Sequence, residues 1–330
     1  MKKSVKTMQV IDIINHGRNN ELILTQKDIP SPGDNEILID IKASGVNRPD
    51  ILQRFGLHPP PKGSPSHPGL EVSGIVTEIG CNVKNFKLGD KVMALLGGGG
   101  YAEFCVANQN LTLPMPENIS FTEAAAIPET YFTVWNNVFR IGKLKENEKI
   151  LIHGGSSGIG TTAIQMSKEF GATVITTTSD KNKEDKCYKI GADMVINYNK
   201  DDFVDIIEKS NFRNVDIILD IVGGDYTNRN FLIASMFARI IQIAYIKGNN
   251  VEIDLSQIMR KSLMHSGSVL RPKDLSYKSA IANDLKKNIM PIIESGKLLP
   301  VIFKTFKLED AYLAHELMKS GKHFGKIVLV

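Results

Sequence analysis

The sequence predicts an α/β protein in which a largely β domain is combined with a doubly wound parallel-sheet domain. Short β-type runs separated by Gly, Pro, Asn and Asp turns fill the chain from Gln9 to about Asn110. After Pro128, strands alternate with helical segments, a pattern typical of parallel βαβ units. After about Ser268 this alternation ends, and the chain finishes in the apolar run GKIVLV. These changes of pattern indicate two domains of different architecture.

The β domain is expected to be discontinuous in the sequence. Its main strands are predicted at EILIDIKASGV, LEVSGIVTEIG and KVMALL, where β-branched residues recur between turn signals. A helix is expected over 275–294, and we expect GKIVLV to return to the strands of the N-terminal part. The predicted β domain therefore comprises residues 1–127 and 269–330. It encloses a predicted nucleotide-binding domain of residues 128–268.

The enclosed domain begins with a predicted strand, glycine turn, helix and second strand between Lys149 and Thr178. Gly155 is expected to form the tight turn, Gly158 to let a pyrophosphate approach the backbone, and Gly160 to let the helix pack closely. The residues predicted to surround the pyrophosphate are Gly155, Ser156, Ser157, Gly158, Ile159 and Gly160. A glycine-rich turn alone is weak evidence, but the flanking strands and helix supply the context of a dinucleotide site.

The end of the second strand, TVITTT, indicates which dinucleotide binds. A carboxylate there would bond the ribose 2′-hydroxyl of NAD, but this strand ends in Thr178 and Ser179. Hydroxyl groups tolerate the additional 2′-phosphate of NADP. Asp180 follows the strand and suits the N-terminus of the next helix better than a ribose.

Cations and a further hydroxyl follow the same strand. Lys181 and Lys183 are expected near the position of a 2′-phosphate, and Tyr198 closes the next strand, MVINY. One charge-assisted hydrogen bond contributes about 1.5 to 3 kcal/mol, which is enough to select NADPH. The alternative is that these lysines are ordinary solvated charges. We predict NADPH as the cofactor, with Thr178, Ser179, Lys183 and Tyr198 on its phosphate side.

Composition excludes several other classes of protein. The 330 residues are 42% hydrophobic, with a net charge of +4 and basic residues spread along the chain, so nucleic acid is not an expected partner. No stretch of the sequence approaches the length of a membrane span, so a membrane is not an expected partner either. The three cysteines form no C-x-x-C pair, which favours a reducing, cytoplasmic environment. Lys2 and Lys3 precede an apolar stretch that is too interrupted for a signal peptide.

Several segments together resemble one family, the zinc-independent quinone oxidoreductases (zeta-crystallin-like) of the medium-chain dehydrogenase/reductase superfamily. The segments are NRPDILQRFGLHPPP, PGLEVSGIV, KLGDKVMALLGGGGYAEF, AAAIPETYFTVWN, LIHGGSSGIGTTAIQ, ILDIVGG and GKIVL. The GGG and SSGIG elements look closest to the tumour-suppressor-inducible branch of that group. The resemblance implies a GroES-like mainly-β catalytic domain and a Rossmann domain that binds NADPH.

The sequence departs from the zinc alcohol dehydrogenases of the same superfamily at two ligand positions. By resemblance, those enzymes carry a cysteine and a histidine where this chain has Asn47 and Leu70. An amide and an alkyl group cannot replace a thiolate and an imidazole as zinc ligands. We therefore predict no metal, and we expect an acceptor that takes hydride readily from the cofactor, a quinone or a conjugated enone.

The resemblance implies further contacts with the cofactor. Asn47 is expected beside the nicotinamide ring with Asp50 supporting its loop, although a turn-stabilising asparagine is the alternative. Thr133 corresponds to a family threonine whose hydroxyl meets the cofactor, although a threonine on the helix surface is the alternative. The other expected contacts follow strands or lie near the domain crossing and the C-terminus: Val222, Gly223, Ala244, Tyr245, Leu270, Arg271, Phe324 and Lys326.

Two residues are candidates for the acceptor side of the site. His58 stands where the family commonly has tyrosine, and its imidazole could donate a proton to a quinone oxygen, although a solvated loop histidine is the alternative. Tyr101 could form an aromatic wall for a flat quinone, and packing inside the β domain is equally compatible with the sequence.

Two classes of function remain after these arguments. The first is NADPH-dependent reduction of a quinone, with an alkenal or enone as the neighbouring acceptor. The second is a non-enzymatic NADPH-binding protein with a sensing, RNA-associated or structural role. A homodimer is expected by resemblance, and RIIQIAY is apolar enough to be the edge strand through which it pairs.

Overall fold

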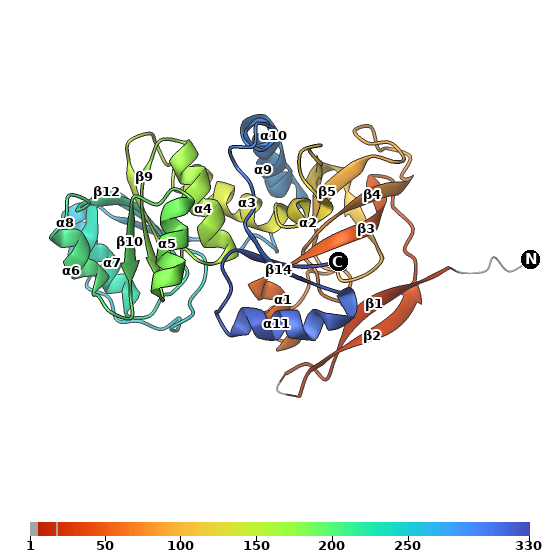
Figure 1. Ribbon diagram of the computed structural model, residues 1–330, viewed down its shortest axis with the longest axis horizontal. Coiled ribbons are helices and arrows are strands. Elements are labelled where there is room, and N and C mark those ends of the chain that lie inside the picture. The colour runs from red at the N-terminus through yellow and green to blue at the C-terminus, as the bar shows by residue number, and fades with distance from the viewer. Residues whose placement is uncertain (1–5, 18) are drawn as a thin grey trace, which may run out of the picture. The chain divides into compact units, whose positions relative to one another are not determined.

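The computed structural model describes residues 6–17 and 19–330, so Lys2 and Lys3 lie outside the described residues. It divides into two compact units (Figure 1). One contains the described residues up to Phe132 together with Arg271–Val330, and the other is Thr133–Leu270. The division falls within helix α3 (Pro128–Val134), and each unit is described by itself.

Unit Thr133–Leu270 is built on a six-stranded sheet in the order β10-β9-β8-β11-β12-β13. All neighbouring strands are parallel. The strands are β8 (Lys149–Ile152), β9 (Thr173–Thr178), β10 (Met194–Asn197), β11 (Val215–Asp220), β12 (Ala234–Gln242) and β13 (Met264–Gly267). The five predicted strands and their parallel arrangement are confirmed. The sixth, β13, was not predicted because its sequence MHSG is short and only one of its residues is a large apolar one.

Helices cover both faces of this sheet. They are α4 (Gly158–Glu169), α5 (Lys181–Lys189), α6 (Phe203–Glu208), α7 (Tyr226–Ile233) and α8 (Leu255–Lys261), and a π-helical segment, η2 (Trp135–Ile141), continues α3. Figure 1 shows α4 and α5 on one side of β9 and β10, with α6, α7 and α8 on the other. On that second face, Phe203, Phe231 and Ile240 are fully buried in one apolar cluster. The sheet core is therefore apolar on both faces, as parallel sheets require.

The predicted edge strand is wrong. RIIQIAY lies in β12 and just beyond it, and β12 pairs with β11 on one side and β13 on the other. Ile240 and Ile241 are fully buried, so the apolar character of this run reflects burial within the sheet and not an exposed edge. The edge on this side is β13.

The other unit is mainly β. Its larger sheet has seven strands in the order β14-β15-β3-β4-β5-β7, with β6 paired to β3, and β1 and β2 form a separate antiparallel pair. The strands are β1 (Thr7–Ile14), β2 (Glu21–Asp28), β3 (Glu36–Val46), β4 (Glu71–Ile79), β5 (Lys91–Leu95), β6 (Phe104–Asn108), β7 (Thr112–Pro114), β14 (Ile302–Phe306) and β15 (Lys326–Leu329). The predicted return of the final strand is confirmed, since β15 pairs antiparallel with β3.

Short helices connect these strands. They are α1 (Arg48–Arg54), α2 (Phe121–Ala124), α9 (Leu275–Asn288), α10 (Met290–Glu294) and α11 (Ala311–Lys319), with the 3₁₀ turns η1 (Gln109–Leu111) and η3 (Leu308–Asp310). The single helix predicted over 275–294 is two helices. Pro291 lacks an amide hydrogen and its ring crowds the preceding turn, so the chain breaks between α9 and α10.

Candidate functional site

The glycine turn between β8 and α4 has the geometry of an anion-binding helix start. Ser157 caps α4, because its Oγ accepts a hydrogen bond from the Gly160 amide at 2.9 Å. A Cβ on Gly160 would lie 2.3 Å from the Gly154 carbonyl oxygen, so only glycine lets the helix approach the turn this closely. Gly154, which precedes the predicted turn glycine Gly155, is left-handed, with φ of +75°.

Gly155 is required for a different reason. A Cβ there would lie 2.1 Å from Oγ1 of Thr176 on β9, so this glycine provides close packing against the neighbouring strand. Ser156, Gly158 and Ile159 are partly exposed around the same turn. Backbone amides at a glycine-rich helix start can form a cradle for the pyrophosphate of a dinucleotide.

The end of β9 presents hydroxyl groups and one cation. Thr178 is buried, and its Oγ1 has no hydrogen-bond partner among the described residues. The Nζ of Lys183 donates to Ser179 Oγ at 3.0 Å and lies 3.6 Å from the Asp180 carboxylate. Asp180 accepts from the Lys183 amide at 3.0 Å and caps α5, as predicted. This donor set suits a phosphate group better than a bare ribose hydroxyl.

Lys181 and Tyr198 differ from Lys183 in their surroundings. Lys181 is exposed and pairs with Glu184 and Asp185 on its own helix. Tyr198 directly follows β10 and is also exposed. Of the two lysines, Lys183 is therefore the one held against the end of β9.

Other predicted cofactor contacts lie after β11 and β12. The Asp220 carboxylate accepts from the Val222 amide at 2.6 Å and the Gly223 amide at 3.0 Å, which shapes the loop after β11. Gly223 has φ of +65° and packs against the backbone of Tyr245. Ala244 accepts a hydrogen bond from the Gln242 side chain, and the Tyr245 side chain is exposed.

Two further predicted contacts belong to this unit. Thr133 is partly exposed in α3, and its carbonyl accepts from Asn137 at 2.8 Å. Leu270 is buried at the end of the unit.

The mainly-β unit brings Asn47, Glu71 and Lys326 together in a buried cluster. Lys326 Nζ donates to Asn47 Oδ1 at 2.6 Å, to Glu71 Oε1 at 2.6 Å and to the Val46 carbonyl at 3.1 Å. The Asn47 Nδ2 donates to Glu71 Oε1 at 2.7 Å. Lys326 and Glu71 are 3% and 0% exposed, so the ion pair is desolvated and its hydrogen bonds fix the Asn47 amide.

A second acid lies beside this cluster. Glu129 at the start of α3 donates its backbone amide to Glu71 Oε2 at 2.8 Å. Burial and the nearby Glu71 carboxylate raise the pKa of Glu129 to about 8, with Lys326 acting in the opposite direction. This shift favours the protonated form of its carboxyl group at neutral pH.

Asp50 supports the Asn47 loop, as the resemblance implies. Its carboxylate accepts from the backbone amides of Asn47 at 2.8 Å and Gly69 at 3.0 Å. Burial raises the pKa of Asp50 to about 6, although these two amides oppose the shift. The Tyr101 hydroxyl lies 3.3 Å from the same carboxylate and 3.1 Å from His315 Nε2.

Tyr101 is fully buried within the mainly-β unit, in an apolar cluster with Val46 and Ile327. A side chain without accessible surface cannot line an open substrate pocket. The alternative weighed from the sequence, packing inside the β domain, is therefore the one that the structure favours for Tyr101.

Arg271 is a buried structural anchor of the mainly-β unit. It donates to the Gly97 carbonyl at 2.7 Å, to Gln53 Oε1 at 2.7 Å and to the His58 carbonyl at 2.9 Å. Burial, followed by the charge of Arg271, lowers the pKa of His58. His58 is therefore a poorer proton donor at neutral pH than the sequence suggests. Phe324, the remaining predicted contact, is buried.

Sequence reasoning missed Glu71, Glu129 and His315. A signal for Glu71 was present, because a carboxylate in the apolar run GLEVSGIV has to be paired when that strand is buried. Glu129 and His315 lie on helices whose sequences give no indication of which neighbours they meet. Their roles are visible only in three dimensions.

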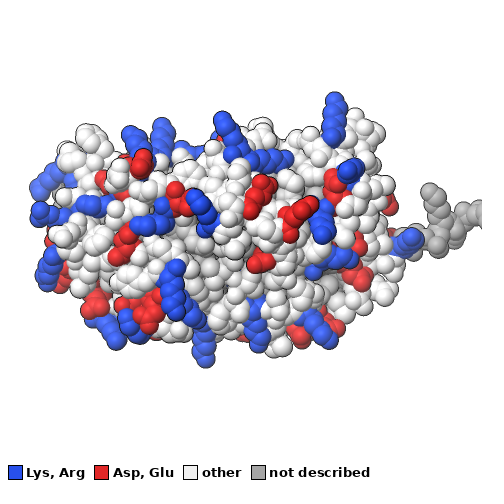
Figure 2. All heavy atoms as spheres, turned by 45° about the horizontal axis from the view of Figure 1, so that its top comes forward, with Lys and Arg blue, Asp and Glu red and all other residues white. Residues whose placement is uncertain are grey.

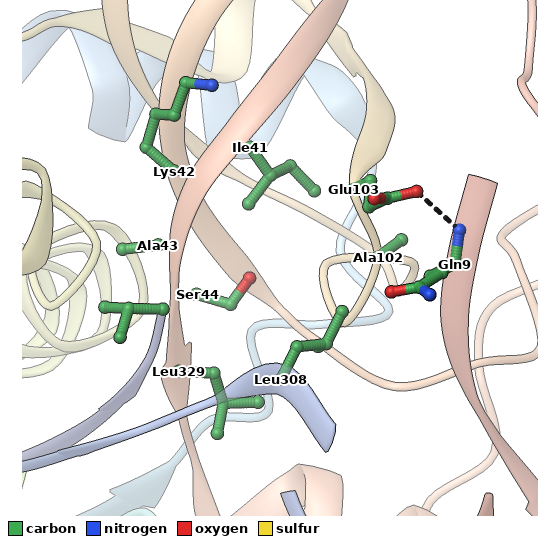
Figure 3. Close-up of a pocket in the computed structure, with 10 residues that line it drawn as sticks. Gln9, Ile41, Lys42, Ala43, Ser44, Ala102, Glu103, Leu308 and Leu329 are labelled. Carbon is green, nitrogen blue, oxygen red and sulfur yellow. Dashed lines mark hydrogen bonds between the residues drawn. The ribbon is translucent and has the colours of Figure 1, made fainter. Parts of the chain in front are cut away.

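A separate hollow of about 220 Å³ lies beside β3 and the end of β15 (Figure 3). None of the predicted site residues lines it. The charged side chains of Glu103 and Lys42 in its lining have partners, since Glu103 accepts from the Gln9 amide at 2.7 Å and Lys42 pairs with Asp40 at 2.8 Å.

Positive and negative side chains are mixed on the visible surface of the protein (Figure 2). Figure 2 shows Lys and Arg interspersed with Asp and Glu over the visible face, without a basic patch. Within residues 6–17 and 19–330, no group of three or more His, Cys, Asp or Glu side chains is arranged to hold a metal ion. None of the described helices combines the length and the apolar character that a membrane span requires.

Comparisons with known proteins identify relatives of the whole chain. Residues 33–117 match the model of the alcohol dehydrogenase GroES-like domain, and residues 190–329 match that of a zinc-binding dehydrogenase. The chain is 31% identical to a quinone oxidoreductase of Sus scrofa and 29% identical to one of Rattus norvegicus, in each case over 100% of both chains. A solved Escherichia coli quinone oxidoreductase complexed with NADPH is 27% identical, with a TM-score of 0.85 over 98% of this chain and 100% of that one.

Proposed function

Because the chain belongs to the quinone oxidoreductase-like family of the medium-chain dehydrogenase/reductase superfamily and is an oxidoreductase, we propose that it reduces a quinone with NADPH and without zinc. The observation that carries the proposal is the glycine turn of β8 and α4 beside a strand that ends in hydroxyls and Lys183. The unit that contains this turn has the parallel sheet typical of dinucleotide-binding folds.

The choice of NADPH over NADH rests on the residues after β9. The buried Thr178 hydroxyl lacks a partner among the described residues, while Ser179 and Lys183 present a hydroxyl and an ammonium group. Asp180, the only candidate for an NAD-type acid at this strand end, is engaged in capping α5. NADPH is also the molecule found with the similar Escherichia coli enzyme.

The absence of a zinc requirement is supported by the surroundings of Asn47. The Lys326 ammonium lies 2.6 Å from both Asn47 Oδ1 and Glu71 Oε1. A positive charge at this position opposes the binding of a metal cation, and Leu70 provides no ligand atom. The residues present therefore do not fit a catalytic zinc ion.

The cofactor, when bound, supplies the hydride, and the chain positions the reactants. Lys326, Glu71 and Asp50 fix the amide and backbone of Asn47, which we propose as a contact of the nicotinamide. We propose the remaining predicted residues after β11 and β12, in α3, at the domain crossing and in the C-terminal segment as secondary contacts. Reduction of a quinone also consumes a proton, and we propose Glu129, whose pKa is raised to about 8 beside Glu71, as a group that holds one.

An acceptor screen tests this function. Purified protein is expected to oxidise NADPH with one or more quinones, and EDTA is expected to leave the rate unchanged. The alternative function is enone reduction. It would be favoured if the protein reduced an alkenal double bond with deuterium from labelled NADPH and did not turn over quinones. Binding of NADPH without turnover of any acceptor would favour a non-enzymatic role, and strong inhibition by EDTA would contradict zinc independence.

Replacing Lys183 with Ala is expected to weaken NADPH binding about ten-fold to a hundred-fold while changing NADH binding little, because only NADPH carries the 2′-phosphate. Fluorescence titrations with both nucleotides measure the two dissociation constants. The matched control is Lys181→Ala, since Lys181 is exposed and already paired with acids on α5. Equal losses for NADPH and NADH in Lys183→Ala would remove Lys183 as a phosphate ligand.

We also propose a cytoplasmic homodimer that pairs through β13, the edge strand next to β12. β13 pairs with β12 on one side and, among the described residues, has no strand beside it on the other side within this sheet. Its first residue, Met264, is 52% exposed. Light scattering at micromolar concentration is expected to give the mass of a dimer, and Met264→Lys is expected to shift it toward a monomer. Leu88→Lys, at an exposed turn of the other unit, is the control. A monomeric parent protein would refute the homodimer.

A further inference from the structure

A buried histidine lies directly before the glycine turn and is linked to two cofactor loops. His153 follows β8 and is 1% exposed. Its Nδ1 lies 3.2 Å from Thr177 Oγ1, and its Nε2 lies 2.8 Å from Asn230 Oδ1. Both ring nitrogens therefore have polar partners inside the unit Thr133–Leu270.

The Asp220 carboxylate determines the direction of these hydrogen bonds. Its carboxylate accepts from the amides of Val222 and Gly223 and, at 3.0 Å, from Asn230 Nδ2. Because an ionised carboxylate can only accept, the amide nitrogen of Asn230 must face it. The Asn230 oxygen then faces His153, so Nε2 of the histidine must be the protonated ring nitrogen.

The remaining bonds follow from that tautomer. With its proton on Nε2, His153 presents a lone pair on Nδ1, which accepts from the Thr177 hydroxyl. The Thr177 oxygen can then accept from the Gly154 amide, which lies 3.2 Å away. A single hydrogen-bonded chain therefore runs from the glycine turn, through Thr177, His153 and Asn230, to the carboxylate that shapes the loop after β11.

The packing around His153 keeps this arrangement in place. The imidazole meets the rings of Phe203 and Tyr226 edge-on at 4.9 and 4.8 Å between centroids. Burial lowers the pKa of His153, although Asp220 and Asn230 act in the opposite direction. A neutral ring is what the chain requires, because a doubly protonated imidazole would have no lone pair for Thr177.

We propose that Thr177, His153, Asn230 and Asp220 form a positioning chain that holds the pyrophosphate turn and the β11 loop in the arrangement that binds the dinucleotide. The proposal rests on the proposed function, since it assumes that both loops contact NADPH. These residues do not touch the reacting atoms in this scheme. They act through Gly154 at one end and through Val222 and Gly223 at the other.

The test breaks the chain at two places with side chains of similar size. Thr177→Val removes only the hydroxyl, and Asn230→Leu removes only the amide. Each variant is expected to raise the Kd for NADPH about ten-fold, which corresponds to the loss of one internal hydrogen bond. Thr177→Ser retains the hydroxyl and is expected to bind within about two-fold of the parent protein. Thr112→Val is the control, because this buried residue of the other unit loses a comparable hydroxyl bond, to the Asn108 carbonyl.

A nitrogen-15 spectrum of the histidine side chains gives a readout that a general loss of packing would not produce. His153 is expected to be neutral with its proton on Nε2, in the parent protein and in Thr177→Ser. A proton on Nδ1, or a charged ring at neutral pH, would overturn the inference independently of any cofactor. Unchanged NADPH affinity in both Thr177→Val and Asn230→Leu would overturn it as well. Failure of the parent protein to bind NADPH would instead overturn the proposed function.

Discussion

Replacing Lys326 with Met is expected to lower the free energy of unfolding of the mainly-β unit by about 3 to 5 kcal/mol, because it leaves the Glu71 carboxylate buried without its counter-charge. The three N–H groups of the ammonium donate to Glu71, Asn47 and the Val46 carbonyl, and none of these acceptors is exposed to solvent. Urea unfolding followed by circular dichroism measures the change.

A second variant distinguishes the effect of losing the ion pair from the effect of losing packing contacts. Lys326→Met combined with Glu71→Gln removes both charges, so it is expected to be more stable than Lys326→Met alone. The control is Lys307→Met, because Lys307 and its partner Glu309 are 75% and 57% exposed and such pairs contribute little. A loss below about 1 kcal/mol in Lys326→Met would show that Glu71 is not held as a buried anion.

Replacing His315 with Gln is expected to make the protein less sensitive to acid. Burial, followed by the charges of Arg54 and Lys319, lowers the pKa of His315 from 6.5 to about 3. Below pH 6.5 the His315 imidazole therefore binds a proton in the unfolded chain but stays neutral in the folded protein. The free energy of unfolding falls as the pH falls from 6.5 toward 3. The shift corresponds to about 5 kcal/mol over the whole range and to about 2 kcal/mol by pH 5.

The measurement compares the free energy of unfolding at pH 7.5 and pH 5 in the parent protein and in His315→Gln. Asp50 acts in the opposite direction, since its raised pKa makes the folded state the better proton acceptor between about pH 4 and 6. The difference between the two proteins isolates His315, and it is expected to be about 2 kcal/mol. His16→Gln, at an exposed position, controls for the loss of a histidine. Parallel pH curves for the parent and His315→Gln would contradict the expected effect.

Local patterns predicted most of the fold. The strands after Pro128 were identified because apolar β-branched runs alternate with helical segments, and a parallel sheet buried on both faces requires such runs. The errors arose where this signal was weak or ambiguous. β13 is only four residues long, and RIIQIAY is apolar because β12 lies inside the sheet, which a sequence cannot distinguish from an apolar edge.

Local patterns also identified the glycine turn before α4, because Gly160 and Ser157 act within a few residues of each other. They identified Asp180 as a helix cap for the same reason. They did not indicate that Gly154 is left-handed, since Gly154 and Gly155 are adjacent and equally able to adopt a positive φ. The roles of the predicted cofactor contacts remain proposals that the experiments above test.

The sequence by itself determined the parallel sheet and the glycine turn, because hydrophobic periodicity, capping and glycine geometry act over a few consecutive residues. Only the tertiary structure decided that Lys326 meets Glu71, 255 positions away, or that His153 faces Asn230 and Thr177. A buried charge or imidazole must find a partner, but spacing along the chain does not say which one. That choice is made when distant strands and helices pack, and it sets the geometry of the candidate site.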